Sequence, residues 1–185
     1  GSMVEEYFGD GSRFTAPDQT PIKIQYAYEK ELLGTAGAIK NAGKLVTEDA
    51  FYVLNADTFY QIDYSRLAQM QAEKDLDLAL VLREVPDISR YGEATLDQGM
   101  LTGFNEKTSE ARPGTINGGI YYMKRELLDE IPEGKVSLEN EMIPKWLSEK
   151  RRLGGFVHDG YFIDIGIPEA YYQFMDDVEK GVIRW

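Results

Sequence analysis

The stretch Phe51-Tyr52-Val53-Leu54-Asn55-Ala56-Asp57-Thr58-Phe59 decides the fold that we expect for this chain. It begins with four apolar residues rich in strand formers, and a short polar turn follows them. This pattern is typical of a buried parallel strand. Ligands of open α/β sheets bind outside the carboxyl ends of the strands, so Asp57 is a candidate site residue. The residues alone leave an alternative open, in which Asp57 only caps a turn or the following helix.

The segments around this strand predict strands and helices in alternation. We expect strands at 22–28 and 76–82, and helices at 35–42 and from about residue 63. The order strand, helix, strand, helix, strand gives right-handed crossovers and a mostly parallel sheet. The expected fold is therefore α/β, one domain over residues 4–185, with three αβα layers and a Rossmann-like sheet.

The second half of the chain departs from simple alternation. Residues 93–106 predict a β-hairpin. A strand at 116–123 carries two adjacent glycines, which favour a bulge or the close approach of a ligand. Ser137 is expected to cap a helix that Pro144 kinks or breaks. The other predicted elements are a first helix ending at residue 8, helices at 124–131, 137–150 and 168–178, and a final pair of strands at 155–158 and 160–165.

Composition limits the chemistry. The chain has 185 residues, no cysteine and one histidine, so disulfides, thiolate metal sites and cysteine nucleophiles are excluded, and a catalytic triad is not expected. Carboxylates remain as ligands for a hard cation such as Mg²⁺. The net charge of −12 argues against a nucleic-acid partner. Because no long apolar run and no signal peptide occur, we expect a cytoplasmic protein without a membrane partner.

Small residues at 34 and 36–38 precede and begin the helix predicted at 35–42. They would let a backbone approach a ligand closely, and Thr35 is expected to cap the helix. A helix start at this position can receive a base, a ribose or a phosphate. The alternative is a plain capped helix packed tightly on the sheet. The ending of a P-loop is missing here.

Six segments of the chain resemble, in the same order, the sugar-1-phosphate nucleotidyltransferases, which join a nucleoside triphosphate to a sugar phosphate. They cover nearly the whole chain, and each is weak alone. Residues 161–168 are most similar to the guanylyltransferases of heptose and mannose 1-phosphates. The resemblance implies the nucleotide-diphospho-sugar transferase fold with a β-hairpin insertion. The segments are Leu33-Gly34-Thr35-Ala36-Gly37-Ala38, Asn55-Ala56-Asp57, Arg90-Tyr91-Gly92, Phe104-Asn105-Glu106-Lys107, Ile116-Asn117-Gly118-Gly119-Ile120 and Phe162-Ile163-Asp164-Ile165-Gly166.

The resemblance also implies roles for single residues. Asp57 and Asp164 are expected to be catalytic and to hold Mg²⁺ between two anionic phosphates, whose repulsion the metal offsets during in-line attack. The substrates implied are a nucleoside triphosphate and a sugar 1-phosphate. The residues expected to bind the nucleotide are Gly34, Thr35, Ala36 and Asn55. The residues expected to bind the sugar phosphate are Gly92, Glu106, Lys107, Asn117 and Gly118.

Structural alternatives stay open for several of these residues. Glu106 and Lys107 also fit a solvated pair at a strand end, and Asn117 fits a residue that satisfies backbone groups at a bulge. Asp164 also fits a cap of the last helix. The motifs leave the base, the sugar and the oligomeric state open, including a homo-oligomer.

Two departures from the family pattern bear on activity. Position 56 is Ala where the family usually has Gly, and the added methyl narrows the approach to the nucleotide. The family's glycine-rich loop with an Arg, and its Lys-Pro motif, have no match here. Because residues 4–10 resemble the helix end that normally follows both, we expect an N-terminally truncated fold that is inactive or nearly so by itself. The competing function is a non-catalytic nucleotide-sugar-binding or regulatory protein.

Overall fold

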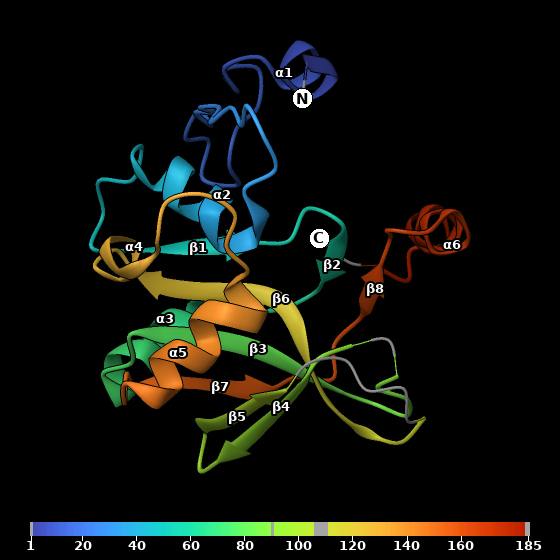
Figure 1. The fold of residues 1–185 in the computed structure, drawn as a ribbon. Helices are drawn as coiled ribbons and strands as arrows, with labels where there is room; N and C mark the ends of the chain where they lie inside the picture. Colours follow the sequence, from blue (N-terminus) through green and yellow to red (C-terminus); the bar gives the residue numbers. More distant parts are fainter. Residues whose placement is uncertain (1, 90, 106–110, 184–185) are drawn as a thin grey trace.

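The computed structural model describes residues 2–89, 91–105 and 111–183, which form a six-stranded sheet, a two-stranded sheet and helices (Figure 1). The main sheet has the strand order β1-β6-β3-β7-β5-β4, and the small sheet pairs β2 with β8. The strands are β1 (Ala50–Leu54), β2 (Thr58–Tyr60), β3 (Leu78–Val85), β4 (Glu93–Asp97), β5 (Met100–Asn105), β6 (Gly114–Lys124), β7 (Leu153–Val157) and β8 (Phe162–Asp164). The helices are α1 (Ser2–Phe8), α2 (Gly34–Gly43), α3 (Ser65–Lys74), α4 (Leu127–Glu130), the π-helix η1 (Leu138–Met142), α5 (Ile143–Ser148) and α6 (Pro168–Glu179).

The main sheet is mixed, so the prediction of a mostly parallel sheet was wrong. Strand β6 lies between β1 and β3 and runs antiparallel to both. Within the described part of the chain, β3 and β7 form the one parallel pair, while β5 pairs antiparallel with both β4 and β7. Strands β1, β3 and β7 still point the same way, as the alternation of strands and helices predicted. The crossover from β1 through α3 to β3 leaves a place between the two strands, and β6 fills it from the opposite direction.

Strand β1 contains the first four residues of the stretch 51–59 that decided the expected fold, and it is not a buried parallel strand. It lies at the edge of the sheet and pairs antiparallel with β6, with Phe51 opposite Met123. Phe51 and Val53 pack against the core. Tyr52 and Leu54 are exposed on the other side of the strand. The four apolar residues therefore divide between two environments, which a continuous apolar run does not reveal.

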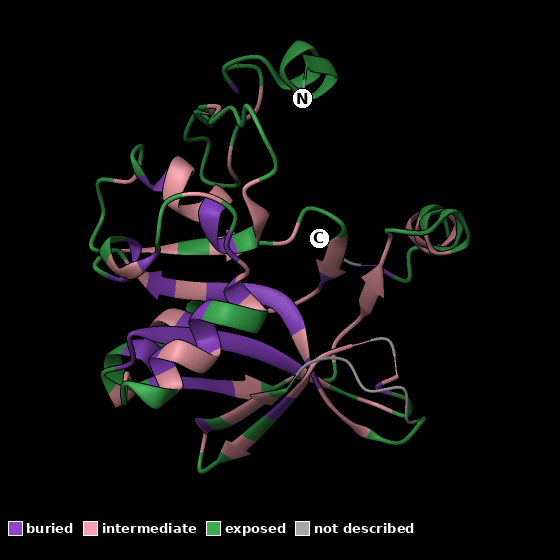
Figure 2. Ribbon diagram, viewed as in Figure 1, coloured by how far each residue is buried: buried purple, intermediate pink, exposed green. Residues whose placement is uncertain are grey.

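Strand β3 separates two hydrophobic cores by simple alternation of its residues. Leu78, Leu80 and Leu82 face a cluster that contains residues of α2, α4, η1 and α5, including the fully buried Trp146. Ala79 and Val81 face a second cluster that includes Leu67 of α3. Figure 2 shows that the buried residues gather in β3, β6 and the adjoining helices. Helices therefore cover both faces of the sheet.

Residues 22–28 do not form the strand that their alternation predicted. The segment has no regular secondary structure and no partner strand among the described residues, and the nearest bridge joins Thr15 to Pro21. It is held instead to the segment after α1, where the Ile24 N–H donates to the Asp10 carbonyl at 2.8 Å and the Ile22 N–H donates to the Phe14 carbonyl at 3.0 Å. Alternation alone does not make a strand, because a strand also requires a neighbouring strand.

The final strands were located correctly but paired wrongly. Strand β7 joins the main sheet beside β3, and β8 pairs with β2 rather than with β7. The sequence reading missed β2, a three-residue strand directly after the turn at Asp57. A strand this short carries almost no periodic signal.

Other local predictions were confirmed. Strands β4 and β5 form the expected hairpin, and its turn residues Gln98 and Gly99 both have positive φ, as a type I′ turn requires. Ser137 caps η1, because its Oγ accepts the Asn140 N–H at 3.1 Å. The predicted helix at 137–150 divides into η1 and α5 near Pro144.

Within the described residues no helix is long and apolar enough to cross a membrane.

Candidate functional site

A cleft of about 680 Å³ opens at the carboxyl end of β1, on the side where the sequence places its candidate residues. Part of its lining comes from Tyr91, Phe104 and the polar residues at the start of η1. We call this cavity the active cleft. The predicted site residues that line it are Asn55, Asp57, Gly92, Asn117 and Asp164. Residues separated by more than 100 positions in the sequence therefore meet in one cavity.

The carboxylates of Asp57 and Asp164 come together because β2 pairs with β8. Thr58, the residue after Asp57, lies opposite Asp164 in the register of the two strands. The Ile165 N–H also donates to the carbonyl oxygen of Asp57 at 2.8 Å. A Cβ on Gly166 would lie 3.0 Å from Asp164 Oδ1 and 3.7 Å from Asp57 Oδ2. The two side chains therefore border one small space, which stays open because residue 166 is glycine.

This space fits a hard divalent cation. Mg²⁺ prefers oxygen ligands and commonly uses one or two protein carboxylates, with water and phosphate oxygens completing its shell. The Gly166 N–H donates to Asp164 Oδ1 at 3.0 Å, which fixes the orientation of that carboxylate and leaves acceptor capacity on it. The described part of the chain, this space included, holds no group of three or more His, Cys, Asp or Glu side chains that could bind a metal ion, so Asp57 and Asp164 would supply two ligands and leave the rest to water and phosphate.

The two glycines of β6 have different roles. The register between β3 and β6 shifts between Leu80 and Leu82, which confirms the predicted bulge. Gly119 has a φ of +74° and lines the active cleft. Gly118 does not line the active cleft. It faces Tyr60 instead, and a Cβ at position 118 would lie 2.7 Å from the Tyr60 ring. The protein's own packing therefore accounts for a glycine at position 118.

The start of α2 lies outside the lining of the active cleft. A Cβ on Gly34 would lie 2.5 Å from the carbonyl oxygen of Val136, and the Ala36 N–H donates to that oxygen at 3.0 Å. Thr35 does not cap the helix. Its hydroxyl donates to Glu139 Oε2 at 2.8 Å and accepts from the Leu138 N–H at 2.7 Å. The backbone here is packed tightly against the protein, as the structural alternative proposed, and Thr35 reaches the cleft through Glu139.

Two predicted sugar-phosphate residues, Glu106 and Lys107, lie outside the described residues. The sequence reading missed Glu139, which lines the active cleft and accepts a hydrogen bond from the Tyr121 hydroxyl at 2.8 Å. Burial raises the pKa of Tyr121 well above its ordinary value, and the nearby Glu139 carboxylate adds to the effect. An acidic residue two positions after an N-cap was a weak signal, because such residues commonly serve only the helix terminus.

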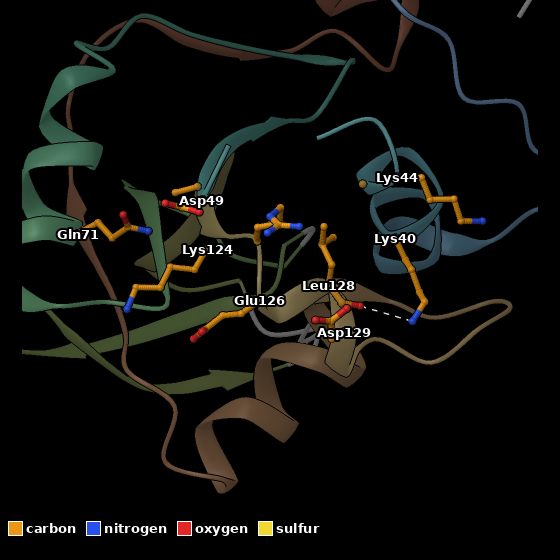
Figure 3. A pocket seen from close by; sticks show the side chains of 11 residues that line it. Lys40, Lys44, Asp49, Gln71, Lys124, Glu126, Leu128 and Asp129 are labelled. Atoms are coloured by element: carbon orange, nitrogen blue, oxygen red, sulfur yellow. Dashed lines mark hydrogen bonds between the residues drawn. The ribbon is translucent and has the colours of Figure 1, made fainter. Parts of the chain in front are cut away.

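A second cleft of about 660 Å³ lies at the other end of β1 (Figure 3). Its lysines mainly bind the protein itself. Lys124 Nζ lies 3.0 Å from Asp75 Oδ1 and 3.4 Å from Asp77 Oδ1, and Lys40 Nζ contacts the carbonyl oxygen of Leu128 at 3.5 Å. Among the residues that the structure describes, none of the predicted site residues lines this cleft.

Known proteins similar to this chain include two enzymes named D-glycero-alpha-D-manno-heptose 1-phosphate guanylyltransferase. The one from Campylobacter jejuni subsp. jejuni is 38% identical over 175 residues, which are 94% of this chain and 72% of that protein. The one from Aneurinibacillus thermoaerophilus is 33% identical over 181 residues, which are 97% of this chain and 75% of that protein.

Solved structures agree with these sequence matches. The crystal structure of HddC from Yersinia pseudotuberculosis complexed with GMP-PN superposes with a TM-score of 0.76 at 32% identity, covering 96% of this chain and 74% of HddC. The family described as Nucleotidyl transferase matches residues 1–181. The resemblance seen in the six motifs is thereby confirmed, and the chain belongs to the nucleotidyl transferase family.

Proposed function

We propose that this protein transfers GMP from GTP to a sugar 1-phosphate, giving a GDP-sugar and pyrophosphate. Family membership supports nucleotidyl transfer, and the names of the relatives support guanylyl transfer to a heptose or mannose 1-phosphate. The complex of HddC with GMP-PN supports a guanine nucleotide as ligand. The single observation that carries the proposal is the pair of carboxylates bordering the space at Gly166.

The reaction requires a phosphate oxygen of the sugar phosphate to attack the α-phosphorus of GTP while the bond to pyrophosphate breaks. When bound, Mg²⁺ supplies the charge neutralisation that brings the two anions together. Asp57 and Asp164 would hold it. In this proposal the role of the two carboxylates is to fix the position of the cation at this end of the active cleft.

Asn117 and Asn55 are proposed to contact the organic parts of the substrates. Asn117 Oδ1 accepts the Gly119 N–H at 3.0 Å and its Nδ2 donates to the Tyr121 hydroxyl. An Asn amide has a second N–H, which remains for a sugar hydroxyl. The backbone N–H of Asn55 donates to the Gly119 carbonyl at 2.9 Å, and a Cβ on Gly119 would lie 2.9 Å from Asn55 Nδ2, so the Asn55 side chain lies at the bulge. Gly92 lines the cleft without a side chain and leaves room for the sugar.

Release of pyrophosphate from GTP, measured with mannose 1-phosphate or a heptose 1-phosphate, tests the proposed reaction. Binding of GDP-mannose is measured beside it, because binding and turnover together distinguish the transferase from the non-catalytic alternative. The matched control for Asp57→Asn is Asp97→Asn, which removes an exposed carboxylate in the hairpin turn.

We expect GDP-mannose to bind, and pyrophosphate release to depend on Mg²⁺ and to be lost in Asp57→Asn but not in Asp97→Asn. Binding of GDP-mannose without any turnover would favour the non-catalytic alternative. Failure of the protein to bind GDP-mannose or GTP at all would overturn the proposal.

A further inference from the structure

A continuous line of hydrogen bonds crosses the floor of the active cleft and joins α2 to β6. The Leu138 N–H donates to the Thr35 hydroxyl at 2.7 Å, and that hydroxyl donates to Glu139 Oε2 at 2.8 Å. The Tyr121 hydroxyl donates to Glu139 Oε1 at 2.8 Å and accepts from Asn117 Nδ2. One carboxylate therefore accepts from both sides and connects elements more than 80 residues apart in the sequence.

The order of donors along this line is fixed by its chemistry. The Glu139 carboxylate only accepts hydrogen bonds, so the hydroxyls of Thr35 and Tyr121 must both point their protons toward it. The Tyr121 oxygen can then only accept from its other neighbour, and it faces the NH₂ side of the Asn117 amide. The Gly119 N–H holds Asn117 Oδ1 from the opposite side at 3.0 Å. The amide of Asn117 is thus held in one of its two flipped orientations.

Burial makes this arrangement stiff. Tyr121 is 1% exposed, so a broken bond at its hydroxyl would not be replaced by water without a rearrangement of the core. Burial also raises the pKa of Tyr121 well above its ordinary range, and the phenol keeps its proton at neutral pH. Glu139, acting through Tyr121, therefore sets the orientation of Asn117 together with the Gly119 N–H, although Glu139 and Asn117 form no direct bond with each other.

We propose that Glu139 is a positioning residue for the sugar-phosphate side of the active cleft. Through Tyr121 it presents the free N–H of Asn117 to a hydroxyl-bearing ligand, and through Thr35 it holds the start of α2 at a fixed distance from β6. Its carboxylate lines the cleft and keeps acceptor capacity for a ligand hydroxyl of its own. The identity of the ligand as a sugar 1-phosphate rests on the proposed function, whereas the positioning of Asn117 does not.

Two variants break the line at different points without removing much volume. Glu139→Gln replaces one accepting oxygen by a donating NH₂, so one of the two hydroxyl contacts must reverse. Tyr121→Phe keeps the ring and removes the hydroxyl that joins Glu139 to Asn117. The matched control is Glu141→Gln in the same π-helix, where the carboxylate accepts the nearby Ser137 N–H at 2.8 Å and lies outside the line from Thr35 to Asn117.

The first measurement uses the ligand-free chain and nuclear magnetic resonance of the Asn117 side-chain amide. We expect both Glu139→Gln and Tyr121→Phe to shift or broaden these signals, while Glu141→Gln leaves them unchanged. Circular dichroism verifies that each variant is folded. Unchanged Asn117 signals in both folded variants would overturn the proposal.

The second measurement is calorimetric binding of mannose 1-phosphate. We expect each of the two variants to bind about tenfold more weakly than wild type, as the loss of a hydrogen bond to a charged or buried group predicts. Wild-type affinity in both variants would overturn the proposal. If wild type itself does not bind mannose 1-phosphate, the proposed function loses its support, and the Asn117 signals alone decide the positioning role.

Discussion

Replacing Gly118 by alanine separates packing from ligand contact at the bulge of β6. A Cβ at this position would lie 2.7 and 2.8 Å from two ring carbons of Tyr60 and 2.9 Å from the carbonyl oxygen of Val81. Tyr60 cannot move away freely, because it is 3% exposed and its hydroxyl donates to the carbonyl oxygen of His158 and lies 3.2 Å from that of Leu82. Overpacking of this kind costs about 1–3 kcal/mol, and loss of a Tyr60 hydrogen bond adds about 1 kcal/mol. We therefore expect Gly118→Ala to lower the free energy of unfolding by about 2–4 kcal/mol.

Urea unfolding followed by circular dichroism measures this change. The control is Gly103→Ala in β5, where the nearest atom to an added Cβ is Thr95 Oγ1 at 3.4 Å, an ordinary contact. We expect the control to change the free energy of unfolding by less than about 1 kcal/mol. A Gly118→Ala variant that is as stable as the control but binds ligand more weakly would refute the packing role and favour the direct sugar contact expected from the sequence.

Three further predictions concern other parts of the chain. Gly166→Ala places a methyl in the space between Asp57 and Asp164, so we expect Mn²⁺ to bind at least about tenfold more weakly, measured by electron paramagnetic resonance, with little change in melting temperature. Ser137→Ala removes the cap of η1 and should cost about 1 kcal/mol in urea unfolding, and an unchanged midpoint would refute the cap's contribution. Burial, together with the bond to Asp177, raises the pKa of Tyr161 to about 12, so the folded state holds this proton more tightly than the unfolded chain. The raised pKa of Tyr161 therefore stabilises the folded state fully below pH 10.0, and this stabilisation is lost as the pH rises toward about 12. Thermal unfolding over this pH range should show the loss in wild type and not in Tyr161→Phe.

Local signals in the sequence were sufficient for most of the elements. Ser137 and Pro144 marked a cap and a break, and the turn at Gln98 and Gly99 marked the hairpin. Strand pairing was harder to predict, because the periodicity of one segment does not identify the strand with which it pairs. The antiparallel entry of β6 between β1 and β3 and the pairing of β2 with β8 follow from the whole chain, not from any one segment.

In the candidate site, too, local motifs predicted single residues, whereas contacts between distant segments could not be predicted. Asp57 and Asp164 were predicted from motifs, and their proximity follows from the β2–β8 pair that the sequence reading missed. Glu139 was missed because its importance lies in two hydrogen bonds to residues distant in the sequence, Thr35 and Tyr121. Such a residue resembles an ordinary acidic residue in the first turn of a helix.

Paramagnetic broadening by Mn²⁺ tests the central claim, that Asp57 and Asp164 hold one divalent cation, most directly. As Mn²⁺ is added, we expect the backbone amide signals of residues 57–58 and 164–166 to broaden first. The same signals should stay sharp in the double variant Asp57→Asn/Asp164→Asn, while Asp97→Asn behaves as wild type. Broadening that persists in the double variant, or that begins instead around Asp49 and Asp129 in the second cleft, would contradict the account.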